Sequence, residues 1–227
     1  MQIKEAIRQG VTAFSDRVMT SGPLIISSRS NGKLGKGKTK ILKGKWKGMP
    51  LYQLTLEERA TCPRSCPVWD SCYGNNMPFA HRRDHRRWGF LQQLKDEVGE
   101  LARKYPAGVV VRLHVLGDFY SISYANTWRR LLDRHPELRV FGYTHRWPGT
   151  EIGDIIHSMN GPRCWIRFSD LGGAMSANVI DPTMSIFGSE PMDTQGIICP
   201  EQTGKTRSCL TCGLCWGTTK PIRFLRH

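Results

Sequence analysis

The sequence lacks the features that would place it across a membrane or outside the cell. None of its segments contains roughly eighteen consecutive apolar residues, the length that a membrane-spanning helix needs. The first residues, MQIKEAIRQG, have neither an apolar signal region nor a small-residue cleavage site. We therefore expect no association with a membrane and a cytoplasmic location.

Acidic residues are scarce. The chain has 33 Lys and Arg against 19 Asp and Glu, a net charge of +14. No acid lies between Asp16 and Glu57, whereas that stretch contains nine basic residues. Such an excess is typical of proteins that bind phosphate polymers, because each neutralised phosphate releases a counterion. We predict nucleic acid as the partner, DNA rather than RNA; an anionic membrane surface and solubility alone are the alternatives.

Cysteine, in contrast, is plentiful, and seven of the eight cysteines form two groups. In a reducing compartment a disulfide framework is not expected, so clustered cysteines indicate metal ligands. The first group has the spacing C-x3-C-x5-C, and the last three members of the second have the C-x2-C-x2-C spacing of ferredoxin-type iron–sulfur sites. The predicted metal ligands are Cys62, Cys66, Cys72, Cys199, Cys209, Cys212 and Cys215.

The number of ligands in the first group favours iron–sulfur chemistry. Three cysteines can hold a [4Fe-4S] cluster and leave one iron open, whereas a structural zinc site takes four ligands. Seven ligands could hold two clusters, as three plus four, or one cluster drawn from both groups. Zinc remains the alternative metal. Gly213 would allow a tight turn between ligands, and Cys164, in the apolar segment CWIRF, is predicted to be a buried small side chain.

Strands and helices alternate along most of the sequence. This alternation predicts an α/β fold with a parallel sheet, curved into a partial (β/α) barrel. We expect an α/β iron–sulfur domain over residues 50–227, preceded by a basic N-terminal extension over residues 1–49 and ending in a cysteine-rich loop from residue 200. Helices are expected at 1–16, 77–105, 121–135 and 150–159, and strands at 50–55, 108–116, 138–144, 162–169, 176–180 and 195–199.

Polar residues follow three of the expected strands. Ligands in parallel α/β sheets bind beyond the carboxyl ends of the strands, so these residues are candidates for catalysis. Cleavage of nucleic acid would need acids such as Asp118, Asp170 or Glu190 to hold Mg²⁺ or Mn²⁺ against the phosphate. The predicted catalytic residues are His114, Asp118, Tyr120, His145 and Asp170.

Two basic segments are candidates for binding the polymer. One is the lysine-rich segment NGKLGKGKTKILKGKWKG, and the other is the arginine-rich part of the predicted helix over 77–105. Basic side chains beside aromatic ones suit single-stranded nucleic acid, because bases stack while phosphates pair. A solvated face is the alternative. The predicted nucleic-acid contacts are Lys36, Lys38, Lys40, Lys43, Lys45, Lys47, Arg82, Arg83, Arg86, Arg87 and Trp88.

Four segments together resemble a known family. In order they are CPRSCPVWDSCYG, RLHVLGDFYSISYANTW, FGYTHRW and ICPEQTGKTRSCLTCGLCW. They resemble the phage and prophage family of the gene product eighty-eight type, over residues 50 to 220. The segment GDFYS, followed by Tyr124 and Trp128, is the most specific part. The resemblance implies a viral origin and metal binding rather than a particular reaction.

The layout is also similar to that of radical SAM enzymes. In those enzymes a three-cysteine loop follows the first strand, and a glycine-plus-acid motif ends the second. The three cysteines of the first group would form the loop, and Gly117 with Asp118 the motif. This resemblance implies that S-adenosylmethionine (SAM) binds the open iron. The spacing departs from the usual C-x3-C-x2-C, and the aromatic Tyr73 follows the last cysteine instead of preceding it.

Three functions are therefore compared. The first is an enzyme that binds nucleic acid and cleaves or modifies it, with a structural or redox-active cluster. The second is a radical SAM-type enzyme with an open-site [4Fe-4S] cluster. The third is a non-catalytic, zinc-stabilised nucleic-acid-binding module. Charge and aromatic content favour polymer binding, and the cysteine spacing departs from the SAM pattern, so the first is the function predicted from the sequence.

Overall fold

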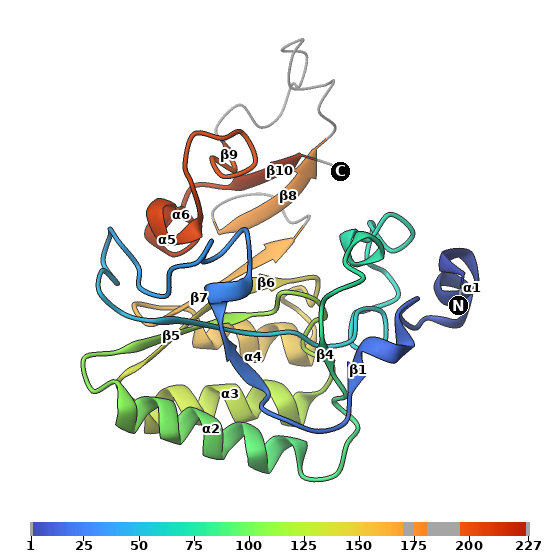
Figure 1. Ribbon diagram of the computed structural model, residues 1–227, viewed down its shortest axis with the longest axis horizontal. Coiled ribbons are helices and arrows are strands. Elements are labelled where there is room, and N and C mark those ends of the chain that lie inside the picture. Colours follow the sequence, from blue (N-terminus) through green and yellow to red (C-terminus); the bar gives the residue numbers. More distant parts are fainter. Residues whose placement is uncertain (1, 170–174, 181–195, 226–227) are drawn as a thin grey trace.

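The computed structural model describes residues 2–169, 175–180 and 196–225 (Figure 1). Its main element is an eight-stranded sheet in the order β2-β3-β5-β6-β7-β8-β10-β9. The edge strands β2 and β9 do not pair with each other, so the described strands form an open sheet and not a closed barrel. The eight strands are β2 (Ile25–Ser27), β3 (Leu51–Leu54), β5 (Val109–Leu113), β6 (Leu138–Thr144), β7 (Cys164–Ser169), β8 (Ser176–Ile180), β9 (Ile197–Ile198) and β10 (Ile222–Leu225).

The sheet is parallel except at one edge, where β2 runs antiparallel to β3. From β3 to β8 the neighbouring strands follow the order of the chain. Helices connect β3 to β5, β5 to β6 and β6 to β7, which confirms the expected α/β class and mostly parallel sheet. The connecting helices are α2 (Phe90–Lys104), α3 (Ile122–Arg134) and α4 (Glu151–Met159). A separate parallel pair joins β1 (Val18–Met19) to β4 (Arg82–Arg83).

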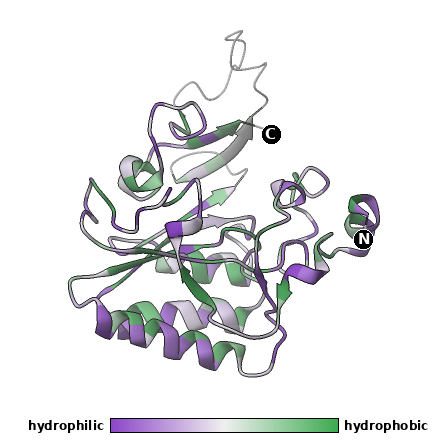
Figure 2. Ribbon diagram, in the orientation of Figure 1, coloured by the Kyte–Doolittle hydropathy of each residue, from purple (hydrophilic) through white to green (hydrophobic). Residues whose placement is uncertain are grey.

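The alternation of side chains along each central strand divides the protein into two cores. In β5, Val109, Val111 and Leu113 point to the core beneath the helices, whereas Val110 belongs to the core on the opposite face. Helices α2, α3 and α4 lie together on the first face (Figure 1) and turn their apolar sides toward the sheet (Figure 2). Burial of this face is the main source of stability, since each buried apolar side chain contributes about 1.5–3 kcal/mol.

The opposite face is covered by two segments that are distant in sequence, residues 28–50 and the C-terminal tail. Trp46 from the first stacks on Trp216 from the second, with ring centroids 5.5 Å apart and planes 9° from parallel. Leu42 and Leu210 join the two segments by a backbone hydrogen bond. The lysine-rich segment is therefore anchored to the sheet by its apolar residues, while β2 adds the antiparallel edge strand.

The expected helix over 77–105 is wrong in its first half, because α2 begins only at Phe90. Gly89 precedes it with a φ of 75°, a left-handed conformation that glycine adopts without strain. Residues 77–89 form turns and the short strand β4. The first expected helix is also shorter than 1–16, since α1 covers Ile3–Gln9 and ends at Gly10. None of the helices in the described residues is long and apolar enough to span a bilayer.

The tail is more regular than the expected loop. It contains two one-turn helices, α5 (Cys209–Cys212) and α6 (Leu214–Gly217), and then β10, which is inserted between β8 and β9. Arg167 of β7 holds this tail. Its guanidinium is fully buried and donates hydrogen bonds to backbone carbonyl oxygens before, within and after the helices. The acceptors are Ser176 (3.4 Å), Leu214 (3.4 Å), Cys215 (3.0 Å), Thr218 and Lys220 (2.9 Å).

Replacing Arg167 by Met should detach the tail from the sheet, because buried carbonyl groups would lose their donor at roughly 1–3 kcal/mol each. We expect the melting temperature to fall by roughly 5–10 °C and limited proteolysis to cut first within residues 196–225. Arg130→Met, at an exposed position of α3, is the control and should leave both readouts unchanged. An unchanged proteolytic pattern for Arg167→Met would contradict the anchoring role.

Candidate active site and cysteine centres

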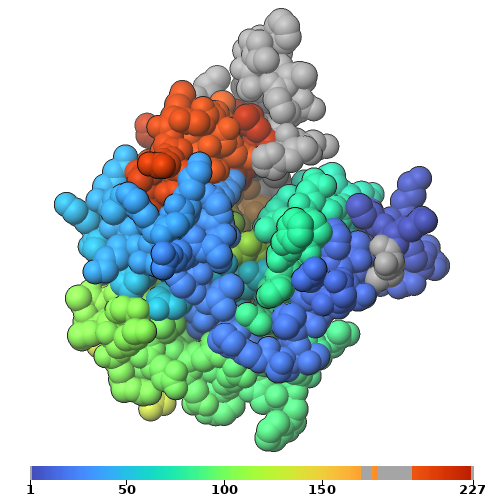
Figure 3. Space-filling model, in the orientation of Figure 1, coloured from blue at the N-terminus to red at the C-terminus, as the bar shows by residue number. Residues whose placement is uncertain are grey.

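A cavity of about 310 Å³ lies at the carboxyl ends of β3, β5 and β6, with residues of β10 closing it from the tail. In Figure 3 a hollow is visible between the segment before β3, the loop after β3 and the tail. The sequence placed its candidates at these strand ends, and six of them meet here. They are Cys62, Cys66, Cys72, His114, Asp118 and His145.

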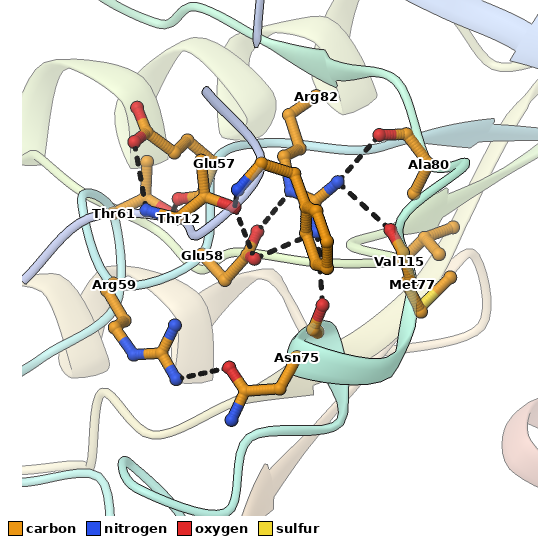
Figure 4. Close-up of polar contacts among 12 residues, drawn as sticks. Thr12, Glu57, Glu58, Arg59, Thr61, Asn75, Met77, Ala80, Arg82 and Val115 are labelled. Atoms are coloured by element: carbon orange, nitrogen blue, oxygen red, sulfur yellow. Dashed lines mark hydrogen bonds and ion pairs between the residues drawn. The ribbon is translucent and has the colours of Figure 1, made fainter. Parts of the chain in front are cut away.

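The loop that carries the first cysteine group is closed at its base by a buried ion pair. Arg82 donates from Nε to Oε2 of Glu58 at 2.7 Å and from Nη2 to Oε1 at 2.9 Å (Figure 4). Its remaining donors reach the carbonyl oxygens of Gly74, Met77 and Ala80, at 3.2, 3.2 and 2.7 Å. Both charged side chains are almost completely inaccessible to solvent. The pair therefore fixes residues 59–81 as a loop with a defined shape.

A second arginine braces the loop from within. Arg59 has a φ of 64° and donates from Nη2 to Oδ1 of Asn75 at 2.6 Å (Figure 4). The same nitrogen also donates to the carbonyl of Trp69 at 3.2 Å. Thr12, from the segment after α1, donates its hydroxyl to Glu58 at 2.8 Å. The N-terminal segment is thus connected to the same ion pair.

Asp118 joins the ends of β5 and β6. Its Oδ1 accepts from the amide of Phe119 at 2.7 Å and from the hydroxyl of Thr144 at 2.7 Å, and its Oδ2 accepts from the amide of His145 at 2.8 Å. Burial raises the pKa of Asp118, and these hydrogen bonds oppose the rise. The preceding Gly117 has a φ of 85° and lies so close to Leu56 that a Cβ would stand 2.7 Å from that side chain. Asp118 therefore positions loops at the cavity.

His145 lies between Asp118 and the first cysteine group. Its Nε2 is 3.8 Å from the Sγ of Cys66. The next residue, Arg146, donates to the carbonyls of Phe119 at 2.8 Å and Thr61 at 3.1 Å. The loops after β3, β5 and β6 are held together by these contacts, so the histidine and the cysteine have fixed relative positions.

Of the remaining predicted catalytic residues that the structure describes, only His114 lines the cavity. His114 is buried, its Nε2 is 2.7 Å from the hydroxyl of Tyr124, and burial together with Arg112 lowers its pKa to about 3. It is therefore a neutral imidazole at the edge of the cavity. Tyr120 does not line the cavity but stacks on Tyr124, with ring centroids 4.6 Å apart. Asp170 and Glu190 lie outside the described residues.

The second cysteine group surrounds a different, much smaller cavity of about 10 Å³, which is lined by Cys199, Cys209, Cys212 and Cys215. No cysteine of one group lines the cavity of the other. Of the two arrangements left open by the sequence, this placement corresponds to three plus four. Gly213, between two of these cysteines, makes the expected tight turn with a φ of 73°.

The cysteines of both groups are partly or fully buried. Burial raises the pKa of Cys62, Cys72, Cys212 and Cys215, so these thiols are neutral at pH 7. Among the described side chains, no group of three or more His, Cys, Asp or Glu is arranged to hold a metal ion. The ligands of a zinc site all bind one ion, whereas the ligands of a cubane bind different irons and stand farther apart. The soft sulfur donors fit an iron–sulfur cluster.

Arg112 and Tyr143 also line the cavity, although they were not predicted from the sequence as site residues. The hydroxyl of Tyr143 donates to the Sγ of Cys215 at 2.7 Å, so one side chain contacts both the main cavity and the second cysteine group. Arg112 interrupts the apolar run VVVRL of β5. A single charge inside a buried strand is the signal that could have identified it, because such a side chain must be satisfied on one face of the sheet.

The predicted nucleic-acid contacts divide by exposure. Arg82 and Arg83 are buried residues of β4 and do not share an exposed helical face with Arg86 and Arg87, so that part of the prediction is wrong. Trp88 is fully exposed. All six predicted lysines are exposed: Lys36, Lys38, Lys40, Lys43, Lys45 and Lys47. Of the aromatic residues beside basic ones, Trp46 and Trp128 are core residues. Cys164 is a buried core residue, as expected.

Comparison with known families identifies the chain. The model of the family Gene product 88 matches residues 25–218, which is most of the sequence and includes both cysteine groups. The chain belongs to the Gene product 88 family. No curated protein and no solved structure matches it. The resemblance to this phage-type family is therefore confirmed, and the chemistry of this Gene product 88 protein has to be argued from its own residues.

Replacing Arg82 by Met should leave the Glu58 carboxylate buried without its partner in this Gene product 88 protein. Breaking a buried ion pair in this way costs about 3–5 kcal/mol. We expect that loss of unfolding free energy in urea denaturation. Arg86→Met, which removes an exposed arginine from the same segment, should cost less than about 1 kcal/mol. Equal losses for the two variants would contradict the stabilising role of the Glu58–Arg82 ion pair.

Proposed function

We propose that the protein is an iron–sulfur enzyme that binds nucleic acid and modifies it in the 310 Å³ cavity. In this proposal Cys62, Cys66 and Cys72 hold a [4Fe-4S] cluster at the cavity. The second cysteine group holds another, with four protein ligands. A cytoplasmic location would provide the reducing conditions that such clusters require.

The observation that carries the proposal is the convergence of the first cysteine group with the strand ends. All three of its cysteines line the cavity of about 310 Å³, and parallel α/β sheets bind ligands at this edge. The loop that carries them is fixed by the Glu58–Arg82 pair. Rigid placement of ligands is what a cluster site needs if substrate is to approach one iron reproducibly.

Modification is favoured over hydrolytic cleavage by the state of the acids at the cavity. Metal-assisted cleavage needs carboxylates that are free to coordinate Mg²⁺ or Mn²⁺. Both oxygens of Asp118 already accept hydrogen bonds, and Glu58 is paired with Arg82. Nuclease activity with either metal remains the alternative predicted from the sequence, and it would depend on Asp170 or Glu190.

Each part of the cavity has a definite task in this proposal. A cluster with three cysteine ligands supplies an iron that can take SAM or a substrate as a further ligand. His145 stands beside Cys66 and is oriented through its backbone by Asp118. The apolar walls, which include Val115, Leu116 and Phe224, exclude water from the reacting groups. SAM itself is the cofactor of the radical SAM-type alternative.

Binding of the polymer is supported by the exposed lysines of residues 36–47. Their segment is anchored by Trp46 beside the second cysteine group, and Lys33, which precedes it, lines the cavity. A cluster of exposed cations would attract a phosphate backbone to this side of the protein. DNA is the proposed polymer, and RNA is the alternative.

Metal analysis tests the cluster proposal. Anaerobically purified protein should contain about eight irons and as much acid-labile sulfide per chain. The triple variant Cys62→Ser, Cys66→Ser, Cys72→Ser should retain about four irons, and Cys212→Ser should also lose one cluster. Cys164→Ala, which removes a cysteine outside both groups, is the control and should keep the full content. Zinc without iron would leave the zinc-stabilised binding module as the function.

Charge reversal tests the binding surface. Changing Lys38, Lys40, Lys43 and Lys47 to Glu should weaken DNA binding and flatten its dependence on salt concentration, since fewer counterions would be released. Lys45 is left intact, because its Nζ lies 3.7 Å from the ring centroid of Trp165.

The matched control reverses four exposed basic residues on helices α2 and α3 and therefore has the same net charge. These residues are Arg103, Lys104, Arg129 and Arg130. Fluorescence anisotropy with a single-stranded oligonucleotide at several salt concentrations compares the two variants. Equal weakening in both would mean that net charge alone, and not the lysine-rich segment, determines the binding.

A further inference from the structure

Arg112 is a cation inside the sheet that forms no ion pair with a described carboxylate. It lies in β5 between Val111 and Leu113, both fully buried. Its side chain is on the sheet face opposite the helices and lines the main cavity. Its Nε is buried without a hydrogen-bond partner, and no hydrogen bond or ion pair joins its guanidinium to a described residue. The one aromatic contact is with Tyr143, 5.9 Å away.

Two fully buried arginines, Arg82 and Arg167, are treated differently. Arg82 has a carboxylate and three carbonyl oxygens, and Arg167 has five carbonyl oxygens. Their hydrogen-bonding capacity is filled by the fold itself. The half-buried guanidinium of Arg112 lacks such partners, so its N–H donors remain available to a group in the cavity.

We propose that Arg112 binds the phosphate or carboxylate group of a nucleotide-sized ligand that occupies this cavity. The planar guanidinium offers two parallel N–H donors, which match either oxyanion. The rest of the ligand lies against apolar walls that include Val68, Met77 and Leu225. A volume of about 310 Å³ admits one small organic molecule.

The position of Arg112 also determines how the ligand is oriented. Arg112 lies within β5, whereas His145 and Cys66 lie in loops beyond the strand ends. An anionic group held at Arg112 would direct the remainder of the ligand toward the first cysteine group. The inference rests on the proposed function in this respect, because it assigns the ligand's anchor in the same cavity.

The test measures binding of three probes to the full chain by calorimetry under anaerobic conditions. The probes are adenosine 5′-monophosphate, S-adenosylhomocysteine and neutral adenosine. Wild-type protein should bind at least one of the two probes that carry a phosphate or carboxylate group more tightly than adenosine. In Arg112→Met that affinity should fall on the order of tenfold to a hundredfold, while the affinity for adenosine is unchanged. Preference for the first or the second probe identifies phosphate or carboxylate as the bound group.

Two further readouts separate this role from a structural one. Removing an unpartnered charge should leave the melting temperature unchanged or raise it, unlike Arg167→Met. Arg112→Lys keeps the charge but loses the paired donors, so its affinity for the anionic probe should be intermediate. Equal affinities in wild type and Arg112→Met, or no preference of wild type for either anion over adenosine, would overturn the inference.

Iron content distinguishes this inference from the proposed function. Arg112→Met should keep the wild-type iron content. A loss of iron in this variant would mean that the guanidinium balances the charge of a cysteine centre, which would overturn the ligand role. Anion binding that depends on Arg112 in a protein without iron would support the inference while refuting the iron–sulfur proposal. Full iron content together with equal affinities of wild type and Arg112→Met would support the iron–sulfur proposal while refuting the inference.

Discussion

The two-residue alternation of the central parallel strands determines where every other part of the protein can lie. Odd-numbered residues of β5 face the helices, and even-numbered residues face the N-terminal segment and the tail. The same alternation in β6 and β7 places Tyr143 and Arg167 on that second face, where they are paired neighbours in the sheet. One face is thus an ordinary apolar core, and the other combines an apolar layer with polar side chains near the carboxyl ends.

Those polar side chains hold the tail in addition to its apolar contacts, which include Leu210 and Trp216 in the second core. Arg167 binds the tail through backbone carbonyls, which every sequence possesses. Arg82 holds the first cysteine loop in the same way, through hydrogen bonds to carbonyl oxygens, and Glu58 neutralises its charge. Both cysteine groups therefore owe their positions to arginines that come from outside their own motifs. The motifs contain the sulfur atoms, and arginines distant in sequence hold the segments that carry them in place.

The central elements could be predicted because their signals are local. Helix α3 begins after Ser121, whose hydroxyl caps it, and the apolar runs of β5, β6 and β7 are strands. The first half of the expected helix over 77–105 failed because Arg82 is bound by Glu58, 24 residues earlier in the chain. Strand β10 was missed because IRFL becomes a strand only between two partners. The meeting of six candidates at one cavity followed from strand direction, whereas the lack of a partner for Arg112 appears only in three dimensions.

The lining of the main cavity extends from Asn31 to Leu225, almost the full span of the described chain. Strand β10, which closes one side, follows the other described strands of the sheet in the chain. A nascent chain can therefore form its helical core, with β5, β6 and β7, well before it has a complete cavity. A chain shortened before β10 would keep most of its apolar core while lacking one wall of its proposed active site.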